Sequence, residues 1–348
     1  MSSLHARARR FTDATVSVIE RRSPPRRILV VSLDNLGDLV FASALTPPLR
    51  KAFPEATIDV WCKQYTSAIA PLIPYVGDVI AADPPWAVSR TAPRPSVVEF
   101  LRSVATVSRG KYDVAILSAA PWRTAATVAI TRIPVRIGMA RHRNSRFLTQ
   151  VLPAEDVRKP VVQEQRRLLA PLGISTGELH YRLDLGPLEM ARDEIARRAA
   201  TEFVALHPFA ASRLRRVPLA EWLRLAASLH ERGDRVLWVG TPVELSEMRR
   251  LHPRGPGLFV DQLGDGSISA TAAAVSLAKA FVGHDSGPLH VANALGVAVV
   301  GIFAPGQPER TFPQGTGLSR VLYSPTPAGI TADQMLRELD ALLISSAA

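Results

Sequence analysis

The sequence predicts an α/β protein built from two doubly wound parallel sheets. Short apolar runs alternate with amphipathic stretches along most of the chain, which is typical of parallel strands joined by right-handed helical crossovers. A charged stretch without strong strands, residues 151–200, separates this series into two halves. The chain has 348 residues, which is long enough for two domains of about 150 residues each.

In the first half, apolar runs bounded by turn residues predict strands at 28–33, 58–61 and 114–117. Runs without polar alternation are expected of strands that are buried on both faces of a sheet. Apolar residues at helical spacing predict helices at 38–53 and 122–132.

In the second half, the same two patterns recur. They predict strands at 203–207, 236–240, 281–283 and 297–303, and helices at 219–231, 243–251, 269–278 and 286–295. We therefore expect a basic leader (1–26), a first domain (27–160), an interdomain segment (161–200) and a second domain (201–348).

The net charge of +11 arises from two stretches. Residues 1–27 carry seven arginines and two carboxylates, a net charge of +5, and residues 114–154 carry six arginines and no carboxylate, a net charge of +6. The remainder of the chain is therefore neutral. In 114–154 only Trp122 and Phe147 are aromatic, so the stacking platform of nucleic-acid binders is missing and we expect no nucleic-acid partner.

The basic leader is expected to form a short helix, and the sequence leaves two roles open for it. Phe11, Ala14 and Val18 recur at helical spacing among arginines, which fits an interfacial helix on an anionic membrane leaflet or a helix docked on the protein surface. No apolar run suits a signal peptide or a membrane span, and the single cysteine, Cys62, excludes a disulfide framework and a cysteine-based zinc site. We therefore expect a cytoplasmic protein, with peripheral contact at the inner face of the cytoplasmic membrane if the leader is interfacial.

The first candidate site follows the strand at 28–33. Gly37 permits a tight turn, and Asp38 stands where the next helix is expected to begin. Backbone N–H groups and the helix dipole would keep this carboxylate ionised. A general base is one role for such a residue, and an ordinary helix cap is the alternative.

The second candidate site follows the strand at 203–207. Arg213, Arg215 and Arg216 lie within four residues of one another, and guanidinium groups suit a phosphate because each can donate two parallel hydrogen bonds. Solvated surface charge is the alternative. Glu244, just past the strand at 236–240, could accept hydrogen bonds from both hydroxyls of a ribose or cap a helix.

The third candidate site follows the strand at 281–283. Asp285 precedes Ser286 and Gly287, whose backbone N–H groups at the start of a helix form a ready anion site. Pro288 suits the first helical turn, where its missing donor costs nothing. His290 lies on the same turn and is either a structural or a catalytic histidine.

In this order, the three loops resemble the family 9 glycosyltransferases, the ADP-heptose-dependent heptosyltransferases of lipopolysaccharide synthesis. The resemblance covers residues 27–310 and depends on the segments 32–38, 205–218 and 283–290. It implies a GT-B architecture, in which two Rossmann-like domains face a cleft. The acceptor would bind to residues 27–160 and the nucleotide-sugar to residues 201–348.

The same resemblance implies a role for each candidate residue. Asp38 matches the family's general base, and Arg215 stands where the family has a phosphate-binding lysine. Ser212 replaces a hydroxyl that the family has at the position of Ala211. Glu244 matches a ribose-contacting acid. The complete predicted donor site is Ser212, Arg213, Arg215, Glu244, Asp285, Ser286, Gly287 and His290.

The predicted reaction is inverting, metal-independent transfer of a heptose or related sugar from ADP-heptose to a hydroxyl of an anionic glycan, such as the lipopolysaccharide inner core. Asp38 would take the proton of the attacking hydroxyl, while arginines and N–H groups would stabilise the departing diphosphate. No cofactor or metal is expected. The anionic acceptor would be bound by Arg123, Arg141, Arg143 and Arg146.

Two alternatives stand beside this prediction. The first is another GT-B enzyme, a transferase with a small-molecule or different surface-glycan acceptor, or a nucleotide-sugar epimerase. The second belongs to a different class, a non-catalytic module that binds anionic surfaces.

Overall fold

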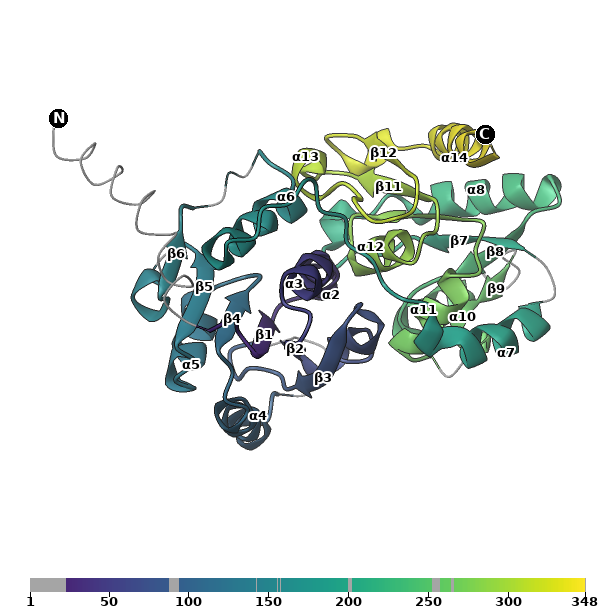
Figure 1. Ribbon diagram of the computed structural model, residues 1–348. Helices are drawn as coiled ribbons and strands as arrows, with labels where there is room; N and C mark the ends of the chain where they lie inside the picture. Colours follow the sequence, from purple (N-terminus) through teal and green to yellow (C-terminus); the bar gives the residue numbers. More distant parts are fainter. Residues whose placement is uncertain are drawn as a thin grey trace, which may run out of the picture. The chain divides into compact units, whose positions relative to one another are not determined.

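The computed structural model describes residues 23–87, 94–141, 143–154, 156, 158–199, 202–251, 257–263 and 266–347. The chain divides into two compact units, with the boundary between Leu179 and His180 (Figure 1). Residues 1–22 of the predicted leader lie outside the described residues. Each unit contains its own parallel sheet with helical crossovers, so the predicted fold class is confirmed.

In the described part of the first unit, six parallel strands form a sheet in the order β3-β2-β1-β4-β5-β6. Ile28 of the central strand β1 lies opposite Ile58 of β2 and Val114 of β4. The strands are β1 (Arg27–Ser32), β2 (Thr57–Cys62), β3 (Val76–Ala81), β4 (Val114–Leu117), β5 (Val135–Met139) and β6 (Gln150–Leu152), and the helices are α2 (Leu36–Ala42), α3 (Thr46–Ala52), α4 (Val97–Arg109), α5 (Trp122–Ile130) and α6 (Val161–Arg166).

The predicted helix at 38–53 is in fact two helices, α2 and α3, joined by a short 3₁₀ turn. Pro47 and Pro48 occupy the first turn of α3. A proline has no N–H to continue an α-helix but is tolerated where a new helix begins, so the break falls just before them.

The second unit, over its described residues, has six parallel strands in the order β12-β11-β10-β7-β8-β9. Gly283 of β10 lies opposite His207 of β7 and Gly301 of β11. The strands are β7 (Phe203–His207), β8 (Arg235–Trp238), β9 (Leu258–Phe259), β10 (Ala280–His284), β11 (Val299–Phe303) and β12 (Ser319–Tyr323), and the helices are α7 (Glu189–Ala199), α8 (Leu219–Glu231), α9 (Pro242–Leu251), α10 (Val260–Leu263), α11 (Ile268–Val275), α12 (Gly287–Ala294), α13 (Pro308–Thr311) and α14 (Ala332–Ala347).

The segment expected between the domains, 161–200, contains the boundary and is divided between the units. Helix α6 contacts α2 of the first unit, whereas α7 contacts α10 and α11 of the second. None of the helices in the described ranges is long and apolar enough to cross a bilayer.

The strand orders show where ligands are expected in each unit. In each sheet the order reverses beside the central strand, between β1 and β4 in the first and between β7 and β10 in the second. In open α/β sheets, ligands bind beyond the carboxyl ends of the strands at such a switch point. The three loops singled out in the sequence follow β1, β7 and β10, so each borders a switch point.

Candidate functional site

Asp38 is the third residue of α2 and forms part of its N-terminal cap. The backbone N–H of Asn35 donates to Asp38 Oδ2 at 3.0 Å, and the Asn35 side chain accepts a hydrogen bond from the Asp38 backbone in return. The helix therefore begins two residues before the position expected from the sequence. Asp38 does act as a cap, and this cap fixes its carboxylate beside the positive end of the helix, where the charged form is favoured.

Tyr65 also binds the N-terminus of α2, a contact that the sequence did not predict. Its hydroxyl accepts the backbone N–H of Leu36 at 2.9 Å, and its side chain is half exposed. Burial, together with the nearby carboxylates of Asp38, Asp34 and Asp83, raises the pKa of Tyr65 to about 12, although the hydrogen bond from the Leu36 N–H lowers it. The hydroxyl therefore keeps its proton at neutral pH and can donate a hydrogen bond beside Asp38.

The arginines of 114–154 occupy two different edges of the first sheet. Arg132 follows the far end of α5, and Arg136 in β5 donates to the carbonyl oxygens of Phe147 at 2.8 Å and Ile133 at 2.6 Å. The other four are exposed and follow the carboxyl ends of β4 and β5, the edge at which Asp38 follows β1: Arg123, Arg141, Arg143 and Arg146. The four arginines predicted to bind the acceptor therefore share one edge of the sheet with the predicted base.

Asn144 fixes the loop that carries three of these arginines. Its side chain is fully buried. Asn144 Oδ1 accepts the backbone N–H of Arg141 at 2.8 Å, and Nδ2 donates to the carbonyl oxygens of Ala120 at 2.7 Å and Met139 at 2.8 Å. One side chain thus joins the loops after β4 and β5. No local sequence signal indicates this role, because the link to the loop after β4 depends on the carbonyl oxygen of Ala120, 24 positions away.

In the second unit, Arg215 and Asp285 bring together the loops after β7 and β10. Arg215 Nη2 donates to Asp285 Oδ2 at 2.7 Å, and Arg215 Nε donates to the carbonyl oxygen of Pro305 at 3.1 Å. The Asp285 side chain is 15% exposed. Burial alone would raise its pKa, but His290 and Arg215 outweigh burial, so the pKa of Asp285 is lowered and the carboxylate is ionised.

His290 orients Asp285 from the other side. The backbone N–H of Gln314 donates to the Tyr181 hydroxyl at 3.0 Å, and this hydroxyl lies 3.1 Å from His290 Nδ1. His290 Nε2 lies 3.5 Å from Asp285 Oδ1, and a proton on Nε2 is needed to face a carboxylate. In the neutral ring Nδ1 then accepts from Tyr181. The buried His290 thus has the structural role that the sequence left open.

Two further histidines lie beneath these loops. The backbone N–H of Val217 donates to His284 Nε2 at 3.0 Å, which ties the arginine loop to the end of β10. Ser286 Oγ donates to the His284 carbonyl oxygen at 3.0 Å and lies 3.4 Å from His207 Nδ1. Burial lowers the pKa of His207 to about 3 and that of His284 to about 4, so both rings are neutral at pH 7.

Glu244 caps α9 and pairs with Arg216. Glu244 Oε2 accepts two hydrogen bonds from Thr241, one from the backbone N–H at 3.1 Å and one from the side-chain hydroxyl at 2.9 Å. Arg216 Nη2 donates to Glu244 Oε1 at 3.2 Å. The capping role is therefore observed, and the remaining lone pairs of the carboxylate are the ones that a ribose could use.

The charge left for an anionic ligand resides mainly on Arg213. Arg215 and Arg216 are each neutralised by a carboxylate, whereas the exposed Arg213 makes no ion pair with any described residue. Ser212 precedes the 3₁₀ turn that carries Arg213 and makes no side-chain capping bond there. Ser286 is the N-cap of α12, and Gly287 is its first residue, as expected for an anion site.

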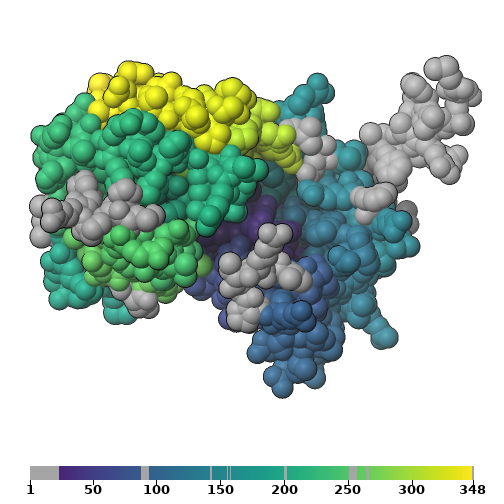
Figure 2. All heavy atoms as spheres, turned by 180° about the vertical axis from the view of Figure 1, so that it is seen from behind, coloured from purple at the N-terminus to yellow at the C-terminus, as the bar shows by residue number. Residues whose placement is uncertain are grey.

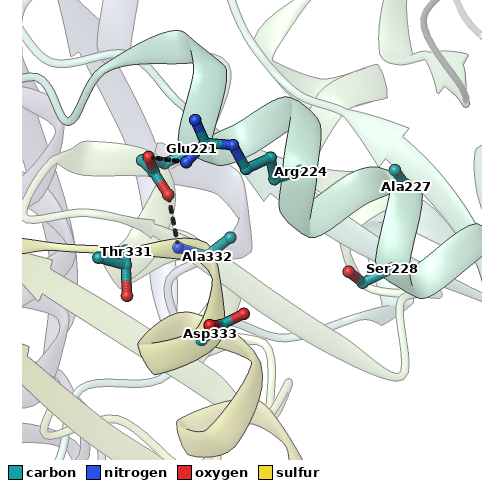
Figure 3. A pocket seen from close by; sticks show the side chains of 7 residues that line it. All are labelled: Glu221, Arg224, Ala227, Ser228, Thr331, Ala332 and Asp333. Atoms are coloured by element: carbon teal, nitrogen blue, oxygen red, sulfur yellow. Dashed lines mark hydrogen bonds and ion pairs between the residues drawn. The ribbon is translucent and has the colours of Figure 1, made fainter.

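A pocket of about 400 Å³ lies between α8 and the start of α14, and none of the candidate residues lines it (Figure 3). Glu221 pairs there with Arg224 and accepts the backbone N–H of Ala332 at 2.9 Å. Because Glu221 and Asp333 line the pocket and its one arginine is already paired, the pocket is unsuited to a diphosphate. The hydrogen bond of Glu221 to Ala332 links α8 to α14, which is a structural role.

The described side chains include no cluster of three His, Cys, Asp or Glu residues placed to hold a metal ion. The sequence pattern of glycosyltransferase family 9 (heptosyltransferase) matches residues 101–332. The chain is 22% identical over 361 aligned positions to lipopolysaccharide heptosyltransferase 2 of Escherichia coli K12, covering 92% of this chain and 100% of that relative.

Solved structures agree with this match. A family 9 glycosyl transferase of Veillonella parvula superposes with a TM-score of 0.79 at 18% identity, covering 92% of this chain and 97% of its own. The E. coli ADP-heptose lps heptosyltransferase II superposes with a TM-score of 0.75 at 21% identity, covering 92% of this chain and 100% of its own.

Proposed function

The chain belongs to glycosyltransferase family 9, and from this membership we propose that it transfers a heptose or related sugar from ADP-heptose to a hydroxyl of an anionic glycan such as the lipopolysaccharide inner core. The proposal of donor and acceptor is supported by the names of two relatives, a lipopolysaccharide heptosyltransferase and an ADP-heptose lps heptosyltransferase. The observation that carries the chemistry is the capped carboxylate of Asp38 at the switch point of the first sheet.

In the proposed reaction, Asp38 accepts the proton of the acceptor hydroxyl while that oxygen attacks the anomeric carbon. The new bond forms as the bond from this carbon to the diphosphate oxygen breaks, so the configuration inverts and ADP leaves. A base of this kind contributes about 10²–10⁴-fold to turnover. The Tyr65 hydroxyl lies near this carboxylate and keeps its proton, so it is suited to orient the acceptor.

Negative charge that develops on the departing diphosphate needs donors that are already in place. We assign this stabilisation to Arg213, to Arg215 and to the N–H groups of Ser286 and Gly287, with Asp285 and His290 holding the loop in shape. The charge of Arg213, which has no carboxylate partner among the described residues, and the N–H donors of Arg215 face the diphosphate in this assignment, and no step of the proposed reaction uses a metal.

On the acceptor side, we assign recognition of negative charge to Arg123, Arg141, Arg143 and Arg146. Their shared edge with Asp38 supports this assignment, since an acceptor bound by these guanidinium groups would also border the base. Long-range attraction by such a patch raises the local concentration of an anionic substrate.

The donor is tested by thermal-shift measurements with a set of nucleotides and nucleotide-sugars. ADP and ADP-heptose should raise the melting temperature because they bind only the folded protein, whereas UDP- and GDP-sugars should leave it unchanged. A shift with UDP- or GDP-sugars and none with ADP-heptose would disprove the proposed donor. Conversion of the nucleotide-sugar without any acceptor would favour an epimerase or hydrolase instead.

A further inference from the structure

Helix α4 of the first unit is apolar on its outer side as well as its inner side. Phe100 and Val107 are buried in the core of the unit. On the opposite side, Val97, Val98 and Leu101 are 55%, 57% and 58% exposed. A surface helix normally turns polar residues outward, and single exposed apolar residues are common, but three within two turns form a continuous apolar face.

Basic residues border this apolar face. Arg102 and Arg109 are exposed and lie on the same helical row as Val98, and Glu99 is the one carboxylate of the helix. Lys111 follows the helix and is also exposed. None of these three cations makes an ion pair with a residue in the described ranges. The outer side of α4 therefore combines unpaired positive charge with exposed apolar side chains.

A pocket of about 610 Å³ continues this surface beyond the end of α4. Lys111 and Arg132 flank it, and Val107, Ile130 and Pro134 supply apolar walls. Ile130 is 70% exposed, and no carboxylate lines the pocket. Arg132 belongs to the basic stretch 114–154 but lies at the opposite edge from the acceptor arginines, so the proposed reaction does not use it.

The α4 surface, by which we mean the outer side of α4 with this pocket, runs along the strand direction of the first sheet. Helix α4 connects β3 to β4, two parallel strands of one sheet, so it runs antiparallel to them. Its 13 residues span about 20 Å, and its first turn lies toward the edge at which Asp38 is found. Figures 1 and 2 both place α4 at the margin of the first unit.

We propose that the α4 surface docks on the surface of an anionic phospholipid membrane. Val97, Val98 and Leu101 enter the boundary between headgroups and acyl chains, while Arg102 and Arg109 contact lipid phosphates. The pocket takes one anionic headgroup between its two cations. A second copy of the chain fits this surface poorly, because pairing it with itself would bring like charges together.

The test is co-sedimentation of the full-length protein with vesicles of phosphatidylcholine containing phosphatidylglycerol, and with vesicles of phosphatidylcholine alone. No sugar donor or acceptor is present, so the result does not depend on the proposed reaction. The wild type should bind the anionic vesicles and bind less as salt is raised.

Two double variants separate charge from apolar contact. Lys111→Asn with Arg132→Asn removes both pocket cations, and asparagine tolerates their left-handed backbone, with φ of 50° and 61°. This variant should bind about thirty-fold more weakly, since each basic residue near an anionic leaflet contributes about fivefold. Val98→Ser with Leu101→Ser should lose about tenfold or more, because the two side chains are each a little over half exposed and together bury in the bilayer about as much apolar surface as one large side chain.

The matched control removes the same kinds of side chain from α14 of the second unit. Arg337 and Ile344 are exposed, and Arg337→Asn with Ile344→Ser should bind like the wild type. The proposal would be overturned if the two double variants bound anionic vesicles as tightly as the wild type, or if the control lost as much binding as they do. It would also be overturned if the wild type bound neutral and anionic vesicles equally. Unchanged vesicle binding with a change of oligomeric state would identify a second copy as the occupant and also overturn it.

Discussion

Replacing Asn144 by alanine tests whether the arginine loop of the first unit is held by a single side chain. The substitution removes the hydrogen bonds to the Arg141 N–H and to the carbonyl oxygens of Ala120 and Met139. Each intramolecular hydrogen bond contributes about 1 kcal/mol net, so the first unit should lose about 3 kcal/mol of stability. Urea denaturation followed by a first-unit tryptophan signal measures this loss.

The same variant should bind the acceptor more weakly. Without Asn144 the loop from residue 140 to 147 loses its link to the end of β4, so Arg141, Arg143 and Arg146 are no longer held in place. Loss of one charge-assisted hydrogen bond corresponds to about a tenfold rise in acceptor KM. Donor affinity should not change, because the donor residues belong to the other unit.

Asn293→Ala is the matched control. Asn293 is equally buried in the second unit, where Oδ1 accepts the Gly315 N–H at 2.5 Å and Nδ2 donates to the Gly317 carbonyl oxygen at 2.7 Å. Its loss should destabilise the second unit by about 2 kcal/mol and leave acceptor KM unchanged. A wild-type acceptor KM in Asn144→Ala, or a stability loss well under 1 kcal/mol, would refute the role given to Asn144.

Three further predictions follow from the two sites. Tyr65→Phe should lower turnover by about tenfold with donor affinity unchanged, since it removes one hydrogen bond beside the base, and steady-state kinetics measures both. Arg213→Ala should weaken ADP binding by about tenfold without loss of stability. Arg215→Ala should lower both ADP affinity and stability, because it removes the guanidinium group that pairs with the largely buried Asp285 and leaves only His290 and Thr311 beside that carboxylate. Calorimetry and denaturation separate the two effects. His207 and His284 are neutral when folded but take up protons when unfolded below about pH 6.5, so stability should fall by about 1.4 kcal/mol per pH unit for each as the pH drops toward 4.

Each of these predictions has an outcome that contradicts it. Wild-type turnover in Tyr65→Phe would remove the hydroxyl from the acceptor site. Equal stability of the two arginine variants would argue against the ion pair of Arg215. If His207→Asn and His284→Gln leave the pH dependence of denaturation unchanged between pH 7 and pH 5, the buried histidines are not its cause.

The sequence predicts the fold and the positions of the candidate loops well because both depend on local patterns. Buried strands such as Val114–Leu117 are continuous apolar runs, and the loops around Arg215 and Asp285 carry their chemistry within a few residues. Strands with polar or exposed positions escaped prediction, among them Val76–Ala81 and Val135–Met139, which contain Asp78 and Arg136 respectively. Helix α4 was missed because its exposed apolar face obscures the helical periodicity.

Residues whose roles depend on distant partners could not be found from the sequence. Asn144 bonds to a carbonyl oxygen 24 positions away, and Tyr65 to an N–H 29 positions away. Tyr181 lies 109 positions from its histidine. A search of every loop that follows a predicted strand would have reached Tyr65, just after β2, but not the other two. The roles of Asn144 and Tyr181 depend on tertiary contacts.

The proposed reaction depends on Asp38 taking the proton of the acceptor hydroxyl. Asn at this position can still accept the Asn35 N–H, so Asp38→Asn preserves the cap of α2 and removes only the base. Turnover of ADP-heptose with a heptose-free lipopolysaccharide core should fall at least about 100-fold, with the affinity for ADP unchanged. Wild-type turnover in Asp38→Asn would show that Asp38 is not the base.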